Sequence, residues 1–269
     1  MKQIKLKQLI AFGLLFWSIF NIQAQENESL GPLETDRPDA TEASSTVPQG
    51  YLQVETGAFY QTFEKNQVKN ESFTYNTTLI RYGLSNNFEL RLGWDLQEDV
   101  THINGQKLED VSSGFSPLLL GMKVYITEEK GWIPEISLIG HVFLPFTAST
   151  DYRPETTGVD FRFSLAHTLS EKSSLGYNLG MAWRNDSPEA NYIYTIAYGY
   201  SISEKFGAYV ELYGDLPEDS KANHLWDAGM TYLVSNDLQL DMSFGTSITE
   251  GQDILLSAGL SFRIPVNNN

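Results

Sequence analysis

Apolar and polar residues alternate one by one along most of this chain. The clearest case lies at 87–98, where Phe88 and Leu90 alternate with Glu89 and Arg91. Successive side chains of a β-strand point to opposite faces, so a strand with this pattern has one apolar face and one polar face. The pattern therefore predicts an all-β chain built from amphipathic strands.

Twelve segments show this alternation, and each has 10–13 residues. A tilted strand needs about 9–11 residues to cross a bilayer. The connections alternate between short turns, such as 85–87, and mostly longer, more acidic loops, such as 63–71 and 99–113. The segments lie at 51–62, 72–84, 87–98, 114–126, 132–144, 157–169, 173–184, 190–202, 205–214, 222–234, 237–247 and 252–264.

An even number of strands with alternating short and long connections predicts a transmembrane antiparallel up-and-down β-barrel of about 12 strands. Its short turns and both of its termini are expected on the periplasmic side. A soluble β-sandwich is the alternative, and its outward face would be densely charged. Here the second face is rich in Gly, Ala, Ser and Thr with scattered charges, which favours a barrel with a polar lumen.

The start of the chain has the pattern of a secretory signal peptide. Lys2, Lys5 and Lys7 precede an apolar run at 9–20, which is too short for a membrane helix of about 20 residues. We therefore expect export and location in the cell outer membrane. The chain divides into a signal peptide (1–24), an N-terminal periplasmic or plug segment (25–50), the outer-membrane barrel (51–265) and a C-terminal tail (266–269).

Composition narrows the possible partners. The formal net charge is −16, and there is no cysteine. Nucleic acid is excluded because its affinity depends on basic contacts to phosphates. The chain has no P-loop, no G-x-G-x-x-G and no metal-ligand spacing, so we expect no cofactor, no metal and no catalytic residue. The expected partners are the lipid bilayer of the outer membrane, the barrel-assembly machinery and an unidentified small solute.

Strand parity places a set of charged side chains in the expected lumen, where acids outnumber bases. One interpretation is a cation-favouring or neutral-solute passage, since acidic rings select cations. The other is that these charges pair across adjacent strands and fill a barrel whose backbone radius is only about 12 Å. The candidate lumen-lining residues are Glu89, Arg91, Asp95, Glu135, His141, Asp160, Arg162, Glu211, Asp227 and Asp241.

A membrane-embedded lipase-like hydrolase is the weakest of the functions considered. Parity places His141 in the lumen and His167 on the apolar face. A hydrolase needs a serine and an orienting acid or amide within hydrogen-bond reach of the histidine. The apolar faces offer no well-placed serine beside His167.

The polar stretch before the first strand carries the one family signature of the chain. Residues 35–39 (TDRPD), 46–48 (TVP) and 53–57 (QVETG) resemble the opening of bacterial outer-membrane proteins of the MetA-pathway phenol-degradation family, often labelled simply "transporter". The resemblance implies a channel-like role, with aromatic compounds as cargo. The cleavage region and the motif are also similar to those of Bacteroidetes envelope proteins.

Asp36, Arg37 and Asp39 of this motif have two possible roles. One is a plug, in which residues 26–48 fold back into the periplasmic mouth and Arg37 meets the acid-rich lumen. The other is a structural cap that orders the start of the first strand, or a docking tag for periplasmic partners. We therefore expect a passive outer-membrane channel for small solutes, with a non-conducting structural or adhesive barrel as the alternative.

Overall fold

A computed structural model describes residues 30–184 and 186–266 of the chain. The expected signal peptide lies outside the described residues, as do 267–269 of the expected tail. The compact unit that begins at Pro32 is the one described below.

The described part of this unit contains twelve long strands, two short strands and two short 3-10 helices, which lie at Pro145–Thr147 and Thr150–Tyr152. The strands are β1 (Tyr51–Lys65), β2 (Val68–Ser85), β3 (Phe88–Ile103), β4 (Gln106–Lys107), β5 (Ser112–Phe115), β6 (Leu118–Thr127), β7 (Glu135–Leu144), β8 (Gly158–Ser170), β9 (Ser173–Trp183), β10 (Asn191–Ser201), β11 (Phe206–Pro217), β12 (Asn223–Ser235), β13 (Leu238–Ser247) and β14 (Ile254–Pro265).

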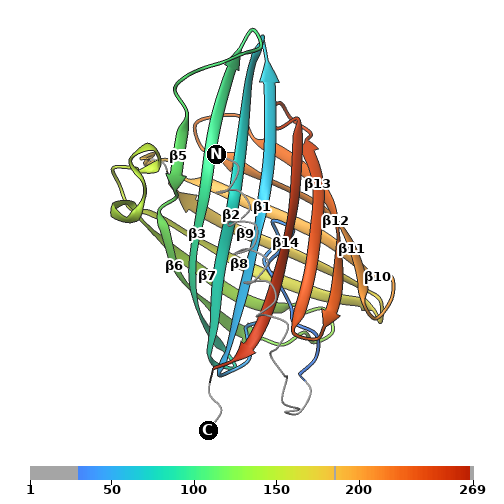
Figure 1. The fold of residues 1–269 in the computed structure, drawn as a ribbon. Coiled ribbons are helices and arrows are strands. Elements are labelled where there is room, and N and C mark those ends of the chain that lie inside the picture. The colour runs from blue at the N-terminus through green and yellow to red at the C-terminus, as the bar shows by residue number, and fades with distance from the viewer. Residues whose placement is uncertain (1–29, 185, 267–269) are drawn as a thin grey trace, which may run out of the picture. The chain divides into compact units, whose positions relative to one another are not determined.

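The long strands form one closed antiparallel ring in which neighbours in sequence are neighbours in space (Figure 1). β1 closes the ring by pairing with β14 from Tyr51↔Pro265 to Thr62↔Ile254. β4 and β5 lie off the ring and pair with the C-terminal half of β3. The structure therefore confirms the predicted up-and-down barrel.

The barrel is polar inside and apolar outside. On β13, Gln239 and Asp241 point inward and are each 6% exposed, whereas Leu240 and Met242 point outward and are 43% and 60% exposed. Apolar side chains are exposed at alternate positions of several other long strands, including β8 and β10. Such a surface is stable only against lipid, so the strands span a bilayer. Separately, no helix in the described part of the chain is long and apolar enough to cross a membrane.

The prediction of a loop at 63–71 was wrong. β1 and β2 continue to a two-residue turn formed by Asn66 and Gln67, both of which have positive φ. The strand ends are polar here, with Glu64 and Lys69 paired across the ladder. Apolar alternation marks the part of a strand that contacts lipid, whereas backbone hydrogen bonds carry the strand beyond it.

Residues 33–48, which we term the lumen segment, lie inside the ring of strands (blue in Figure 1). Arg37 pairs with Asp241 of β13, and Ser44 donates a hydrogen bond to Glu135 of β7. β13 and β7 lie on opposite sides of the ring. The lumen segment therefore crosses the bore from wall to wall.

Gly50 turns the chain from the lumen segment into β1. Its φ of 79° lies in the left-handed region that glycine adopts without strain. Its N–H donates to the Gly83 carbonyl of β2 at 2.8 Å, and its carbonyl accepts from the Val266 N–H at 2.8 Å. The end of the lumen segment is thus fixed to the strands on both sides of β1.

Candidate functional site in the barrel lumen

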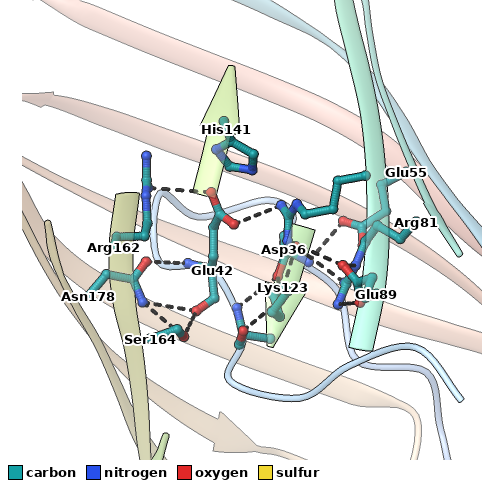
Figure 2. Close-up of polar contacts among 12 residues, drawn as sticks. Asp36, Glu42, Glu55, Arg81, Glu89, Lys123, His141, Arg162, Ser164 and Asn178 are labelled. Carbon is teal, nitrogen blue, oxygen red and sulfur yellow. Dashed lines mark hydrogen bonds and ion pairs between the residues drawn. The ribbon is translucent and has the colours of Figure 1, made fainter. Parts of the chain in front are cut away.

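Asp36 lies at the centre of a buried cluster of basic side chains (Figure 2). Its carboxylate forms ion pairs with Arg91 at 3.0 Å, Lys123 at 3.2 Å and Arg81 at 3.4 Å. Burial alone would raise the pKa of Asp36, but these three cations outweigh it and hold the pKa well below its usual range. The carboxylate also accepts from the Ala43 N–H at 2.8 Å, which folds the lumen segment back on itself.

Arg81 of β2 joins three strands to the lumen segment. It is fully buried, and its guanidinium pairs with Glu55 of β1 and Glu89 of β3, each at 2.8 Å. The same group donates to the Glu34 carbonyl and to the Ser45 carbonyl, each at 3.3 Å. A guanidinium can satisfy all of these acceptors because its donors form a planar fork.

Glu42 anchors the middle of the lumen segment through its side chain and its backbone. The carboxylate pairs with Arg91 at 2.7 Å and Arg162 at 3.5 Å. Burial would raise the pKa of Glu42, but these arginines lower it to about 2. The backbone N–H donates to Asn178 Oδ1 at 2.7 Å, and the carbonyl accepts from Asn178 Nδ2 at 3.0 Å and from the Ser164 hydroxyl.

His141 of β7 is held by an acid but reaches no hydroxyl. Its Nδ1 lies 2.8 Å from Asp160 Oδ1, and Asp160 also pairs with Arg184. Within the described residues, His141 Nε2 has no hydrogen-bond partner. His167 pairs with Glu129 at 3.6 Å instead. The described residues therefore assemble no Ser–His–acid triad at His141.

The wall formed by β11 and β12 is acidic. Glu211 accepts from the Thr41 hydroxyl and, at 2.8 Å, from the Ala40 N–H, and Asp227 is its cross-strand partner on β12. Asp39, a partly exposed residue of the lumen segment, lies close to both. Burial and the charges of Glu211 and Asp227 raise its pKa well above the usual range. The carboxyl groups of Asp39, Glu211 and Asp227 therefore lie close together on this side of the lumen segment.

Arg37 packs against a pair of glycines on β1 and β14. Its Nη2 lies 2.9 Å from both Asp241 and the Ser257 hydroxyl. Gly57 and Gly259 lie beside the guanidinium, and a Cβ on either would come within 2.5 Å of Arg37 Nη2. Two glycines at paired positions thus make room for the arginine of the TDRPD motif.

Two cavities of about 470 Å³ each flank the lumen segment. The loop-end cavity lies towards the long loops and is lined by Arg91, His141 and Arg162. The turn-end cavity lies towards the short turns and is lined by Asp39 and Glu135, among others. Glu42 lines both cavities. The lumen segment is therefore the partition between them.

The structure places all ten candidate lumen residues on the inner face, where most take part in ion pairs or hydrogen bonds. Asp95 lines the loop-end cavity, and Glu135 accepts from Ser44 at 2.5 Å and from Tyr125 at 3.2 Å. A role for these residues in solute passage stays a prediction. Seven of the ten are buried with 6% exposure or less, namely Glu89, Arg91, His141, Asp160, Glu211, Asp227 and Asp241.

Three inner charges are absent from the sequence-based candidates, namely Glu42, Arg81 and Arg184. Arg81 lies between the outward-facing Ile80 and Tyr82, so parity alone identifies it as an inward charge. Glu42 belongs to a segment without periodicity, so no pattern could assign its contacts. Arg184 directly follows the last residue of β9 and keeps the inward parity of that strand.

In the Asp39→Asn variant, the lumen segment should stay bound more firmly than in the wild type as the pH rises. A raised pKa favours the protonated carboxyl in the folded state, so its contribution is complete below about 4, the ordinary value, and is lost as the pH rises through the raised value. Amide hydrogen exchange across 33–48, corrected for intrinsic exchange, should therefore accelerate with pH in the wild type and less so in D39N. Equal pH dependence in both proteins would contradict the raised pKa of Asp39.

Comparison with known proteins supports the fold. A model of the family described as "Putative MetA-pathway of phenol degradation" matches residues 35–264. An outer membrane channel from Pseudomonas putida F1 has a TM-score of 0.66 and 14% identity, covering 86% of this chain and 100% of that one. The NanC porin has a TM-score of 0.51 and 9% identity, covering 79% of this chain and 100% of that one.

A third similar structure is the translocator domain of the autotransporter NalP from Neisseria meningitidis. It has a TM-score of 0.52 and 9% identity, covering 81% of this chain and 90% of that one. At such identities the likeness concerns the architecture, which is that of outer-membrane β-barrels. No curated protein sequence matches the chain.

Proposed function

The chain belongs to the family described as "Putative MetA-pathway of phenol degradation", and from this premise we propose that it is a passive outer-membrane channel for small solutes with the lumen segment as an internal plug. The short turns face the periplasm, as is usual for such barrels, and the barrel-assembly machinery inserts the chain. The solute needs no catalytic step, because diffusion down a gradient drives passage.

The observation that carries this proposal is the partition of the bore into two cavities. A barrel filled only for stability has no need of a separate polar segment between two chambers of about 470 Å³. The Leu33 N–H donates to the Asn236 carbonyl at 2.8 Å, but the rest of the lumen segment is held to the wall through side chains rather than by a backbone ladder. Because the ring of strands closes without these contacts, the segment can open locally while the barrel wall stays intact.

Small aromatic solutes are the cargo class that the family description suggests. The loop-end cavity supports this choice, because Leu79, Leu119 and Phe143 form an apolar wall beside its arginines. Binding sites of this size commonly combine an apolar wall with a few convergent polar groups. We propose that solutes enter from the loop end and pass the lumen segment towards the turn end.

Planar-bilayer recording and liposome swelling test the proposed function. Folded protein should produce discrete ion-conducting steps, and proteoliposomes should swell in arabinose or glycine faster than liposomes with heat-unfolded protein. Volatile neutral phenols cross bare lipid and are unsuitable as swelling solutes. Silence in both assays, for the wild type and for a variant lacking residues 26–46, would support a non-conducting structural or adhesive barrel instead.

A further inference from the structure

The floor of the loop-end cavity holds polar atoms that have no partner. Within the described residues, Arg91 Nε, Arg162 Nε and His141 Nε2 are buried and make no hydrogen bond. His141 and Arg91 are each only 4% exposed, and all three residues line the cavity. Unsatisfied buried polar atoms are uncommon and costly, and their convergence on one cavity indicates a place for a polar ligand group.

Three arginines line this cavity against two carboxylates, those of Glu42 and Asp95, so its charge favours an anion. Arg91 and Arg162 each pair with one oxygen of the Glu42 carboxylate, and Arg184 lines the same cavity. An organic cation would meet these guanidinium groups at short range. A planar carboxylate can match their donor forks, whereas Glu42 makes only a single-atom ion pair with each arginine. Replacing Glu42 by an external carboxylate would also preserve the local charge balance.

The walls of the cavity add a second requirement. Leu79, Leu119 and Phe143 provide apolar surface next to the guanidinium groups, and the Arg184 guanidinium stacks over the Phe143 ring at 4.0 Å. A ligand with an apolar body gains from this wall, whereas a small hydrophilic anion does not. The site therefore favours a monocarboxylate that carries an aromatic or other apolar body.

Glu42 can release its arginines without unfolding the lumen segment. Its backbone is held independently by Asn178 and Ser164, so the carboxylate can rotate away while the backbone stays bound. Arg91 also pairs with Asp36 at 3.0 Å, so the same guanidinium connects two carboxylates of the lumen segment. An anion that competes for Arg91 weakens both of these attachments.

We propose that the loop-end cavity binds a small organic monocarboxylate with an apolar body, whose carboxylate replaces that of Glu42 on Arg91 and Arg162 and thereby loosens the lumen segment. This inference rests on the proposed channel function and gives it a substrate class. Glu42 acts in it as a built-in competitor. The ligand occupies the loop-end cavity and weakens the attachment of the lumen segment, which separates this cavity from the turn-end cavity.

Calorimetry with benzoate tests binding without any need for conduction. Folded wild-type protein in detergent should bind benzoate saturably, and should bind acetate, benzyl alcohol, inorganic phosphate and trimethylphenylammonium at least about tenfold more weakly, since each lacks the carboxylate, the apolar body or the negative charge. Glu42→Gln should tighten benzoate binding about tenfold by removing the competitor, and Arg162→Gln should abolish it.

Glu135→Gln is the matched control, because Glu135 also contacts the lumen segment but pairs with Ser44 and Tyr125 rather than with an arginine. Its benzoate affinity should equal that of the wild type. In bilayers, benzoate on the loop side should raise the open probability of the wild type and of E135Q but not of R162Q. Heat-modifiable gel migration verifies that each variant is folded.

The outcomes separate the two proposals. Ion conductance without preferential benzoate binding overturns the carboxylate site and leaves the channel intact. Benzoate binding that is equal in wild type, E42Q and R162Q also overturns the site. Absence of conductance in every variant overturns the channel function, whatever the calorimetry shows. Stronger binding of phosphate than of benzoate assigns the site to inorganic anions and contradicts the proposed substrate class.

Discussion

Removal of residues 26–46 is expected to raise the single-channel conductance about fivefold, because conductance scales with the open cross-section and the lumen segment fills much of a bore whose backbone radius is about 12 Å. The segment crosses the bore between β7 and β13, and it has no backbone ladder with the strands around it. Planar-bilayer recording of the two folded proteins measures the difference.

The truncated barrel should still fold. Each of the twelve long strands keeps both neighbours, and the ring is closed by β1 and β14 without help from the segment. Deletion removes Asp36, so Arg81 and Lys123 each lose an ion-pair partner, which costs stability. Water that enters the emptied lumen solvates their charges and limits this cost. Unchanged conductance in a folded truncated protein would remove the plug hypothesis.

Gly83→Ala tests the plug hypothesis in a full-length chain. A Cβ on Gly83 would lie 2.2 Å from the Pro48 carbonyl oxygen and 2.3 Å from that of Val47, so the end of the lumen segment has to move. Overpacking of this kind typically costs about 1–3 kcal/mol. We expect G83A to raise the open probability and to speed amide exchange at 47–50.

Gly93→Ala is the control for this substitution. On the neighbouring strand β3, a Cβ on Gly93 has its nearest contacts at 3.4–3.6 Å, which is ordinary van der Waals distance. G93A adds the same methyl group to the inner face without displacing the lumen segment. Equal gating in G83A and G93A would show that the position of residues 47–50 does not control the bore.

Arg81→Met is expected to lower the free energy of unfolding by about 3–5 kcal/mol, the usual cost of removing one partner from a buried charge network. Arg81 is fully buried and pairs with Asp36, Glu55 and Glu89. Methionine keeps much of the side-chain length but leaves these carboxylates without their main countercharge. Urea unfolding of protein refolded into lipid vesicles, followed by tryptophan fluorescence, measures the loss.

Lys65→Met provides the comparison with an exposed ion pair. Lys65 Nζ lies 2.6 Å from Glu250, but the two side chains are 50% and 60% exposed. Such a pair contributes less than about 1 kcal/mol because water screens it. Adding Glu89→Gln to Arg81→Met should recover part of the stability. A loss in R81M no larger than that in K65M would disprove the central role of Arg81.

Strand parity identified many inner charges but could not identify their partners. Glu89, Arg91 and Asp241 were assigned to the lumen because the period of two is a local property of each strand. Arg81 was overlooked although it follows the same rule, and a bulge between Thr74 and Asn76 interrupts the alternation earlier in β2. No local pattern indicates that Arg81 contacts the Glu34 and Ser45 carbonyls.

The sequence by itself determined the class of fold, the number of long strands and the inward or outward direction of most side chains. These features depend on neighbouring residues and on the choice between lipid and water, which the residue pattern records directly. Only the tertiary structure decided where residues 33–48 lie, that Glu42 separates two cavities, and that Asp36 meets three cations. Those facts depend on ring closure, which brings strands distant in the chain around one aperiodic segment, and no local periodicity encodes that meeting.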